Sequence, residues 1–182
     1  PVVSQGARTT LPSPQPLGRA QVLRGVERGP KISDSLYRGA QPTAEGFTEL
    51  KKLGIKTVVN LRSMHCDKDE LEGLGLRYVR IKCEAWDPDD KETLAFLKIM
   101  QDPANHPVFV HCQHGADRTG FMVAAWRMTN DGWSRQDAAT ELRNFGFHEI
   151  WTQIVRYLGK FDPASAKIRL KDFPAPAVEV VD

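Results

Sequence analysis

The sequence has few cysteines, no long apolar run and no dense cluster of basic residues. Its three cysteines form an odd, widely spaced set without a CxxC pair, which excludes a disulfide framework and lacks the spacing of zinc ligands. The formal net charge is only +2, so a nucleic-acid-binding surface is not expected. No stretch approaches the ~20 apolar residues of a membrane span. We therefore expect no metal, no nucleic-acid partner and no membrane span.

The chain has the size and composition of one globular domain, with 182 residues, of which 41% are hydrophobic and 26% charged. We expect a Pro-rich lead-in at residues 1–30, a folded domain at 31–162 and an irregular C-terminal tail at 163–182. The chain starts at Pro1 without a methionine. This fits an exported protein, periplasmic or extracellular, after removal of a signal peptide, and a shortened cytosolic chain would look the same. Of the two, we favour export.

Strand and helix patterns alternate along the predicted domain. Apolar, β-rich runs predict strands at residues 55–61, 77–81 and 107–111, after extended segments at 31–38. Helical patterns with capping signals occupy residues 43–54, 90–100, 119–131, 134–145 and 148–158. This alternation is typical of an α/β domain, so we expect a central, mostly parallel sheet of four to five strands flanked by helices.

The stretch Val110–Gly120, VHCQHGADRTG, leaves a buried strand and enters a helix. Ligands in α/β sheets bind at such places, beyond the carboxyl ends of strands. Gly115 and Ala116 let the loop curl with its N–H groups inward, which makes an anion site at a helix N-terminus. That site favours the nucleophilic thiolate form of Cys112. Arg118 can grip two phosphate oxygens in a planar fork that Lys cannot reproduce.

Two neighbours can support this loop. The hydroxyl of Thr119 can donate a hydrogen bond to the Cys112 thiolate or to the leaving sulfur, and His111 can fix the loop by hydrogen bonding to its backbone. The loop therefore predicts phosphate chemistry with a cysteine nucleophile.

The HCxxGxxRTG pattern around Cys112 resembles the active-site loop of the protein tyrosine phosphatase superfamily. Its position late in a short chain is similar to the dual-specificity and atypical bacterial branches. LYRGAQPTA (36–44) and LGIKTVVNLRS (53–63) also resemble this bacterial group, and the resemblance covers roughly residues 31–160. The compact build and the arginines at strand ends are similar to the tyrosine-phosphatase-like inositol polyphosphatases, the phytases.

The resemblance implies a tyrosine-phosphatase-like fold and a two-step reaction. Cys112 attacks phosphorus and forms a thiophosphoryl intermediate, which water then hydrolyses. No cofactor is expected, because the loop supplies the charge stabilisation. The implied phosphate-binding residues are Gln113, His114, Gly115, Ala116, Asp117 and Arg118.

The resemblance also implies a general acid on a loop upstream of the nucleophile. The acidic loop Glu84–Asp90 is the right kind of segment, although the usual Trp-Pro-Asp order is absent. We choose Asp87, which could instead cap the following helix. Asp89, Asp90 and Glu84 remain open, as does Asp117.

Substrate recognition is the least specified property. Arg38, Arg62 and Lys82 follow strand-like segments and could line the substrate rim, but structural ion pairs explain them equally well. By resemblance we expect a phosphorylated small molecule, an inositol polyphosphate such as inositol hexakisphosphate. The alternative is a phosphotyrosine or dual-specificity protein phosphatase acting on a phosphoprotein. A phosphate-binding scaffold and a sulfurtransferase are further classes, which the intact Cys-Arg pair and the Arg-Thr-Gly ending disfavour.

Overall fold

The computed structural model describes residues 23–29 and 31–182, and its centre is a five-stranded sheet. The strand order is β1-β4-β2-β3-β5, with the first four strands parallel and β5 antiparallel to β3. The strands are β1 (Leu36–Gly39), β2 (Thr57–Asn60), β3 (Leu76–Arg80), β4 (Val108–His111) and β5 (Glu179–Val181). The predicted α/β class with a mostly parallel sheet is confirmed.

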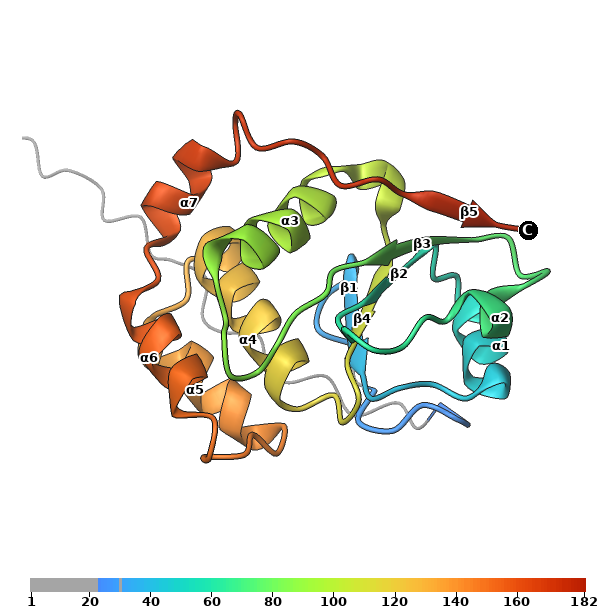
Figure 1. The fold of residues 1–182 in the computed structure, drawn as a ribbon, viewed down its shortest axis with the longest axis horizontal. Helices are drawn as coiled ribbons and strands as arrows, with labels where there is room; N and C mark the ends of the chain where they lie inside the picture. Colours follow the sequence, from blue (N-terminus) through green and yellow to red (C-terminus); the bar gives the residue numbers. More distant parts are fainter. Residues whose placement is uncertain (1–22, 30) are drawn as a thin grey trace, which may run out of the picture.

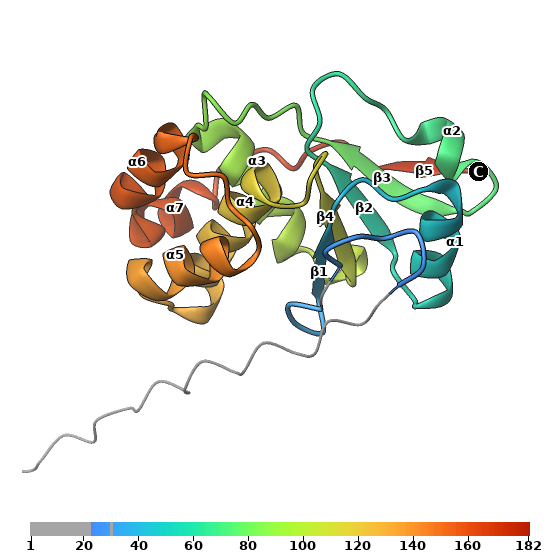
Figure 2. The same ribbon diagram turned by 90° about the horizontal axis from the view of Figure 1, so that it is seen from below.

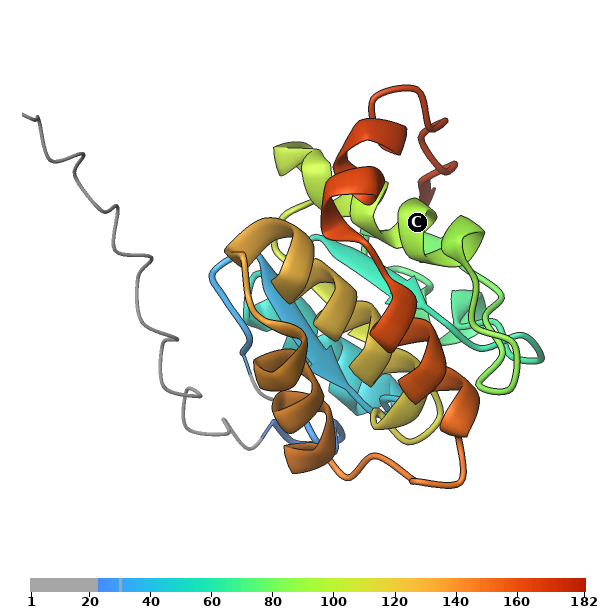
Figure 3. The ribbon, with the colours of Figure 1, turned by 90° about the vertical axis from the view of Figure 1, so that its left-hand side faces the viewer.

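Helices cover both faces of this sheet (Figure 1). The smaller layer consists of α1 (Ala44–Lys52) and α2 (Lys68–Leu71). The larger layer consists of α3 (Asp90–Gln101), α4 (Asp117–Trp126), α5 (Arg135–Asn144), α6 (Thr152–Lys160) and α7 (Pro163–Arg169). Within it, α5 and α6 lie on either side of α4 (Figure 3). The two short helical segments are η1 (Pro103–Asn105) and η2 (Arg127–Asp131).

The alternation of side chains along β4 divides the core into two apolar clusters. Val108 and Val110 belong to the cluster under the larger helical layer, whereas Phe109 belongs to the cluster under α1 and α2. His111 also faces α1, because its ring contacts Phe47 edge-on at 6.1 Å. Successive side chains of a strand point to opposite faces, so Cys112 returns to the side of the larger layer, where it joins that cluster.

The C-terminal segment differs from the prediction of an irregular tail at 163–182, because it contains α7 and β5. Asp162 caps α7 through a hydrogen bond from the Ala164 N–H, and Pro163 stands at the first helical position, where its missing N–H costs nothing. Farther on, β5 pairs with the open edge of β3, with Glu179 opposite Tyr78. The prediction was wrong here because a short edge strand depends on a distant partner.

The predicted lead-in at residues 1–30 lies outside the described residues, apart from 23–29. Those residues are packed on the domain: Val26 is buried in the cluster under α1, and the Ala40 N–H donates to the Glu27 carbonyl at 2.9 Å. The folded domain therefore begins before residue 31.

Two helix starts also differ from the prediction. α4 begins at Asp117 rather than at Thr119 and continues through the π-helical turn of η2 to Gly132, at φ 68°. α6 begins at Thr152 rather than near His148, whose backbone N–H is held outside the helix by Asp117 at 2.9 Å. None of the helices in the described ranges has the length and apolarity needed to cross a membrane.

Candidate active site

The loop from Cys112 to Ala116 joins β4 to α4 at the carboxyl edge of the sheet, where the loops that follow the other parallel strands also lie (Figure 2). Cys112 is 2% exposed and lies directly after β4. Gly115 has φ 67°, and a Cβ there would stand 2.5 Å from the backbone nitrogen of Ala40. Only glycine therefore lets the loop lie this close to the end of β1.

Arg38 lies beneath this loop and not on its rim, which corrects the prediction. Its side chain is fully buried and donates to the Gly115 carbonyl at 2.8 Å. The guanidinium stacks over the Phe145 ring at 4.0 Å. Burial lowers the pKa of Arg38 to about 10, against the attraction of Glu141 and Cys112. Along β1, Arg38 shares the face of Leu36, which packs under the larger helical layer.

His111 also differs from the prediction, because its hydrogen bond goes to a side chain and not to the loop backbone. Its Nε2 lies 2.8 Å from Oδ2 of Asp67, and both residues are 0% exposed. Burial alone would raise the pKa of Asp67, but hydrogen bonds from His111 and Gln41 hold it below its usual value. A buried carboxylate needs such partners, and His111 faces α1 and α2, where Asp67 lies.

Arg62 is connected to the same buried carboxylate. It is half-buried and donates to Oε1 of Gln41 at 2.7 Å, while Gln41 donates to Oδ1 of Asp67 at 2.8 Å. Partial burial lowers the pKa of Arg62, and repulsion from Arg118 lowers it further. Attraction from Asp67 and Cys112 acts in the opposite direction but does not outweigh the burial. Arg62 thus lies within electrostatic reach of the nucleophile, and its place on the substrate rim stays a prediction.

The predicted rim residue Lys82 is exposed in the segment after β3. Arg118 is half-buried in the first turn of α4, at the far end of the loop from Cys112. The structure therefore brings Cys112, Arg118 and Arg62 together, while Lys82 has no described contact with them.

Two residues at the start of α4 have different surroundings. Asp117 accepts hydrogen bonds from the backbone N–H of His148 and from its Nδ1, the latter at 2.9 Å from Oδ2. This carboxylate ties the loop before α6 to the phosphate loop. The Thr119 hydroxyl is buried and makes no hydrogen bond with any described residue, so the predicted bond to Cys112 is not formed here.

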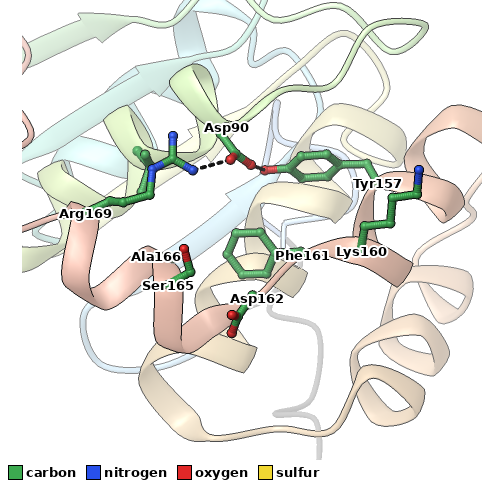
Figure 4. Close-up of a pocket in the computed structure, with 9 residues that line it drawn as sticks. Asp90, Tyr157, Lys160, Phe161, Asp162, Ser165, Ala166 and Arg169 are labelled. Atoms are coloured by element: carbon green, nitrogen blue, oxygen red, sulfur yellow. Dashed lines mark hydrogen bonds and ion pairs between the residues drawn. The ribbon is translucent and has the colours of Figure 1, made fainter.

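The carboxylates of the acidic loop Glu84–Asp90 differ in their hydrogen bonding. Asp89 caps α3, accepting from the backbone N–H of Lys91 at 2.6 Å. Asp90 lies between Tyr157, whose hydroxyl donates to it at 2.9 Å, and Arg169 of α7 (Figure 4). Asp87, in contrast, is exposed, and no hydrogen bond to its carboxylate is found within the described ranges.

One further carboxylate, Glu92, has unusual surroundings. Burial raises its pKa to about 7, helped by a hydrogen bond with Asp89. Its Oε2 is buried without a hydrogen-bond partner in the described part of the chain. Glu92 and Cys112 both add to the raised pKa of Cys83, whose main cause is burial, so both groups lie within electrostatic reach of Cys83.

In the described part of the chain, one group of side chains has the spacing of a metal site. Donor atoms of His65, Asp67 and Glu70 lie within 4.8 Å of one another. Both oxygens of Asp67 already accept hydrogen bonds, from Gln41 and His111. The hydrogen-bond network around the buried Asp67 therefore explains the close spacing of these three side chains without a metal ion.

Sequence reasoning missed three residues at this site, namely Asp67, Glu92 and Arg28. Asp67 lies 44 positions from its partner His111, and no local pattern could connect them. Arg28 was assigned to the lead-in, yet its guanidinium donates to the His114 carbonyl of the phosphate loop at 3.3 Å. The acidic first turn of α3 was a signal for Glu92, although one equally typical of helix capping.

Comparison with protein families agrees with this geometry. The family model described as "DSP-PTPase phosphatase fused to NAD+ Kinase" matches residues 24–156. The chain belongs to this family of dual-specificity-type phosphatases, which confirms the predicted superfamily and enzyme class.

Two individual relatives differ in the activity that their names state. The chain is 36% identical over 121 residues to the dual specificity protein phosphatase TpbA of Pseudomonas aeruginosa, a match covering 64% of this chain and 54% of TpbA. It is 25% identical over 139 residues to the inositol diphosphatase DSP5 of Arabidopsis thaliana, covering 72% of this chain and 68% of that protein. The matched part thus spans about half the length of TpbA.

Solved structures share the fold. The crystal structure of TpbA has a TM-score of 0.75 at 28% identity and covers 86% of this chain and 98% of its own. The catalytic domain of the PP-IP phosphatase SIW14 from S. cerevisiae has a TM-score of 0.72 at 22% identity, covering 83% and 97% of the two chains. This second likeness concerns the fold alone.

Proposed function

We propose that this chain hydrolyses phosphomonoesters through a cysteinyl-phosphate intermediate on Cys112. The observation that carries the proposal is the placement of Cys112, buried at the start of a tight loop that runs into the N-terminus of α4. Unpaired N–H groups at a helix N-terminus and the helix dipole stabilise both a thiolate and a phosphate. Arg118 closes the far end of the loop.

In the proposed reaction, the Cys112 sulfur forms a bond to phosphorus while the bond from phosphorus to the leaving oxygen breaks. Arg118 and the loop N–H groups hold the equatorial oxygens. Asp87 gives its proton to the leaving oxygen. Water then attacks phosphorus, its proton passes to Asp87, the sulfur–phosphorus bond breaks, and inorganic phosphate leaves with the thiolate restored.

For the substrate, we propose an inositol polyphosphate such as inositol hexakisphosphate. Two cationic groups near the loop support a heavily phosphorylated substrate: Arg62 lies within electrostatic reach of Cys112, and Arg28 is hydrogen-bonded to the loop itself. Several relatives are named inositol diphosphatases.

A phosphotyrosyl protein is the second candidate. The exposed Trp86 of the acidic loop lies beside Trp151, with ring centroids 6.4 Å apart, and this pair could pack against an aromatic substrate. One of the TpbA structures contains pTyr. The ratio of kcat/KM on inositol hexakisphosphate to that on a phosphotyrosyl peptide distinguishes the two substrates.

The nucleophile is tested by Cys112→Ser. We expect no turnover of p-nitrophenyl phosphate by this variant, while inorganic phosphate still binds, because the loop and Arg118 are intact. Arg118→Lys should lower kcat by roughly 10²–10³, the usual cost of removing one transition-state donor. Turnover by Cys112→Ser at the wild-type rate would exclude Cys112 as the nucleophile.

The general acid is tested by Asp87→Asn. A general acid contributes about 10²–10⁴ to the rate, and wild-type kcat should fall on the alkaline side, where the acid loses its proton. Asp87→Asn should lack this alkaline decrease, whereas Asp89→Asn, whose amide oxygen can still cap α3, should keep it. A decrease retained in Asp87→Asn and lost in Glu92→Gln would transfer the role to Glu92.

A further inference from the structure

We infer that Arg28, His114 and His148 form a second anion subsite, which binds another phosphate of the substrate beside the one held by the catalytic loop. The inference rests on the proposed function. It adds a residue from the segment before β1, which no local sequence pattern connects with the site.

The guanidinium of Arg28 lies between the catalytic loop and the loop before α6. Its NH1 donates to the His114 carbonyl at 3.3 Å. On its other side it lies against Gly146, where a Cβ would stand 3.3 Å from NH1 and 3.5 Å from Cζ. Arg28 is exposed, so its remaining N–H groups face solvent and can bind an anion.

The two histidines complete the cluster. The His114 and His148 rings meet edge to face, with centroids 5.9 Å apart. Nδ1 of His148 donates to Asp117, which orients the ring and leaves Nε2 free of that bond. His148 is half-exposed and His114 is exposed. Both rings can therefore present a polar nitrogen to the ligand that Arg28 binds.

The backbone of Arg28 is a second, independent indication. Arg28 has φ 52°, the one positive value among the non-glycine residues that the structure describes. Non-glycine residues in this region are strained by about 1 kcal/mol or more and concentrate at functional positions. This strained residue is the one whose guanidinium donates to the catalytic loop.

A cavity adjoins the cluster. It has a volume of about 810 Å³ and lies between the segment before β1 and the catalytic loop. Its polar lining includes Arg24, Arg28, Gln41, Gln113, His114 and Glu27. Among these six lining residues Glu27 carries the negative charge. The positive charge of Arg24 is partly neutralised by Glu45, whose Oε1 lies 3.5 Å from the guanidinium.

The chemistry of the cluster favours a phosphate. A guanidinium is a planar donor that suits tetrahedral oxyanions, and imidazoles can donate to the same group. His114 is two residues from Cys112, so the Cα atoms of these two residues are at most about 7 Å apart. That spacing suits two phosphates carried on one small molecule.

The test is Arg28→Gly, because glycine accepts the positive φ and keeps the fold. We expect kcat/KM on inositol hexakisphosphate to fall roughly fivefold, mainly through KM, as for loss of a favourable exposed charge pair. The value on p-nitrophenyl phosphate, which has one phosphate, should fall clearly less, because there only the hydrogen bond from Arg28 to the loop is lost. Lys52→Ala is the matched control, since it removes one exposed charge at the far end of α1 and should alter neither substrate.

Three outcomes would overturn the inference. An equal loss on both substrates would mean that Arg28 only supports the loop, and no loss on either would mean that it binds nothing. If Arg28→Gly lowers kcat/KM only on a phosphotyrosyl peptide that has an acidic residue beside its phosphotyrosine, the subsite binds a carboxylate. If the wild type hydrolyses neither substrate, the proposed function fails. The subsite is then judged in Cys112→Ser protein, where Arg28→Gly should weaken binding of inositol hexakisphosphate more than binding of inorganic phosphate.

Discussion

Replacing Asp67 by Asn should destabilise the domain strongly, although it changes one atom. Oδ2 of Asp67 accepts from His111 at 2.8 Å and Oδ1 accepts from Gln41 at 2.8 Å, with Asp67 and His111 both at 0% exposure. Asparagine has one oxygen, so its NH₂ group must face one of these two donors. The variant thereby leaves a buried donor unpaired and removes the charge opposite His111.

Breaking a buried pair on one side costs about 3–5 kcal/mol. Because Asn keeps the volume and one acceptor, we expect the lower end, about 3 kcal/mol. For a domain of this size the melting temperature falls by about 2–4 °C per kcal/mol, which gives about 6–12 °C. Thermal unfolding followed by circular dichroism measures this shift, and kcat should fall as well, because His111 directly precedes the nucleophile.

The control for this change is Asp34→Asn. The Asp34 side chain is 98% exposed, and among the residues that the structure describes its ion pair is with Lys31, so the variant should melt close to the wild type. The pKa of Asp67 is held below its usual value of 3.8, so its stabilisation is present above that value and is lost as the pH falls through the lower folded-state value. The difference between wild type and Asp67→Asn should therefore shrink in acid. A melting temperature for Asp67→Asn within about 2 °C of the wild type at pH 7, less than 1 kcal/mol, would refute the reasoning.

Three other changes have defined outcomes. Gly115→Ala should lower the free energy of unfolding in urea by about 3 kcal/mol, because the alanine is strained at φ 67° and its Cβ overlaps the backbone of β1. Gly54→Ala, at φ 94° with open space around it, should lower it by the strain alone, about 1 kcal/mol. Arg38→Met should leave the free energy of unfolding within about 1 kcal/mol, because an apolar side chain replaces a buried charge; kcat should nevertheless fall, since Gly115 loses its donor, and unchanged kcat would contradict this role. The folded state holds the proton of Glu92 up to a pKa of about 7 against a usual 4.5, so stability should decrease as the pH rises through that interval, and Glu92→Gln should abolish that decrease in urea midpoints at pH 5 and 8.

The phosphate loop could be predicted from sequence because its parts are contiguous. A buried strand, a glycine and an arginine follow one another within Val110–Gly120, and local geometry determines what they can do. The α/β class was predictable for a similar reason, since the helical and strand periods alternate along the chain.

The surroundings of the loop could not be predicted in this way. Arg38 follows a strand-like segment, but the pattern did not show that it shares the buried face of Leu36. His111 needed a partner, and that partner came from the distant N-cap position of α2. Such contacts depend on how the elements pack in space, which one sequence without an alignment does not reveal.

The short strand β5 also affects how copies of the chain behave toward one another. Strands β1 to β4 form a sheet whose β3 edge would otherwise present unpaired backbone N–H and C=O groups. β5 pairs with Leu76, Arg77 and Tyr78 along this edge, and Glu179 forms an ion pair with Lys68 of α2. An open strand edge is a template for a strand from a second molecule. Removal of residues 179–182 would therefore expose the β3 edge to pairing with a strand of another molecule. Such a variant should self-associate while its catalytic loop stays intact.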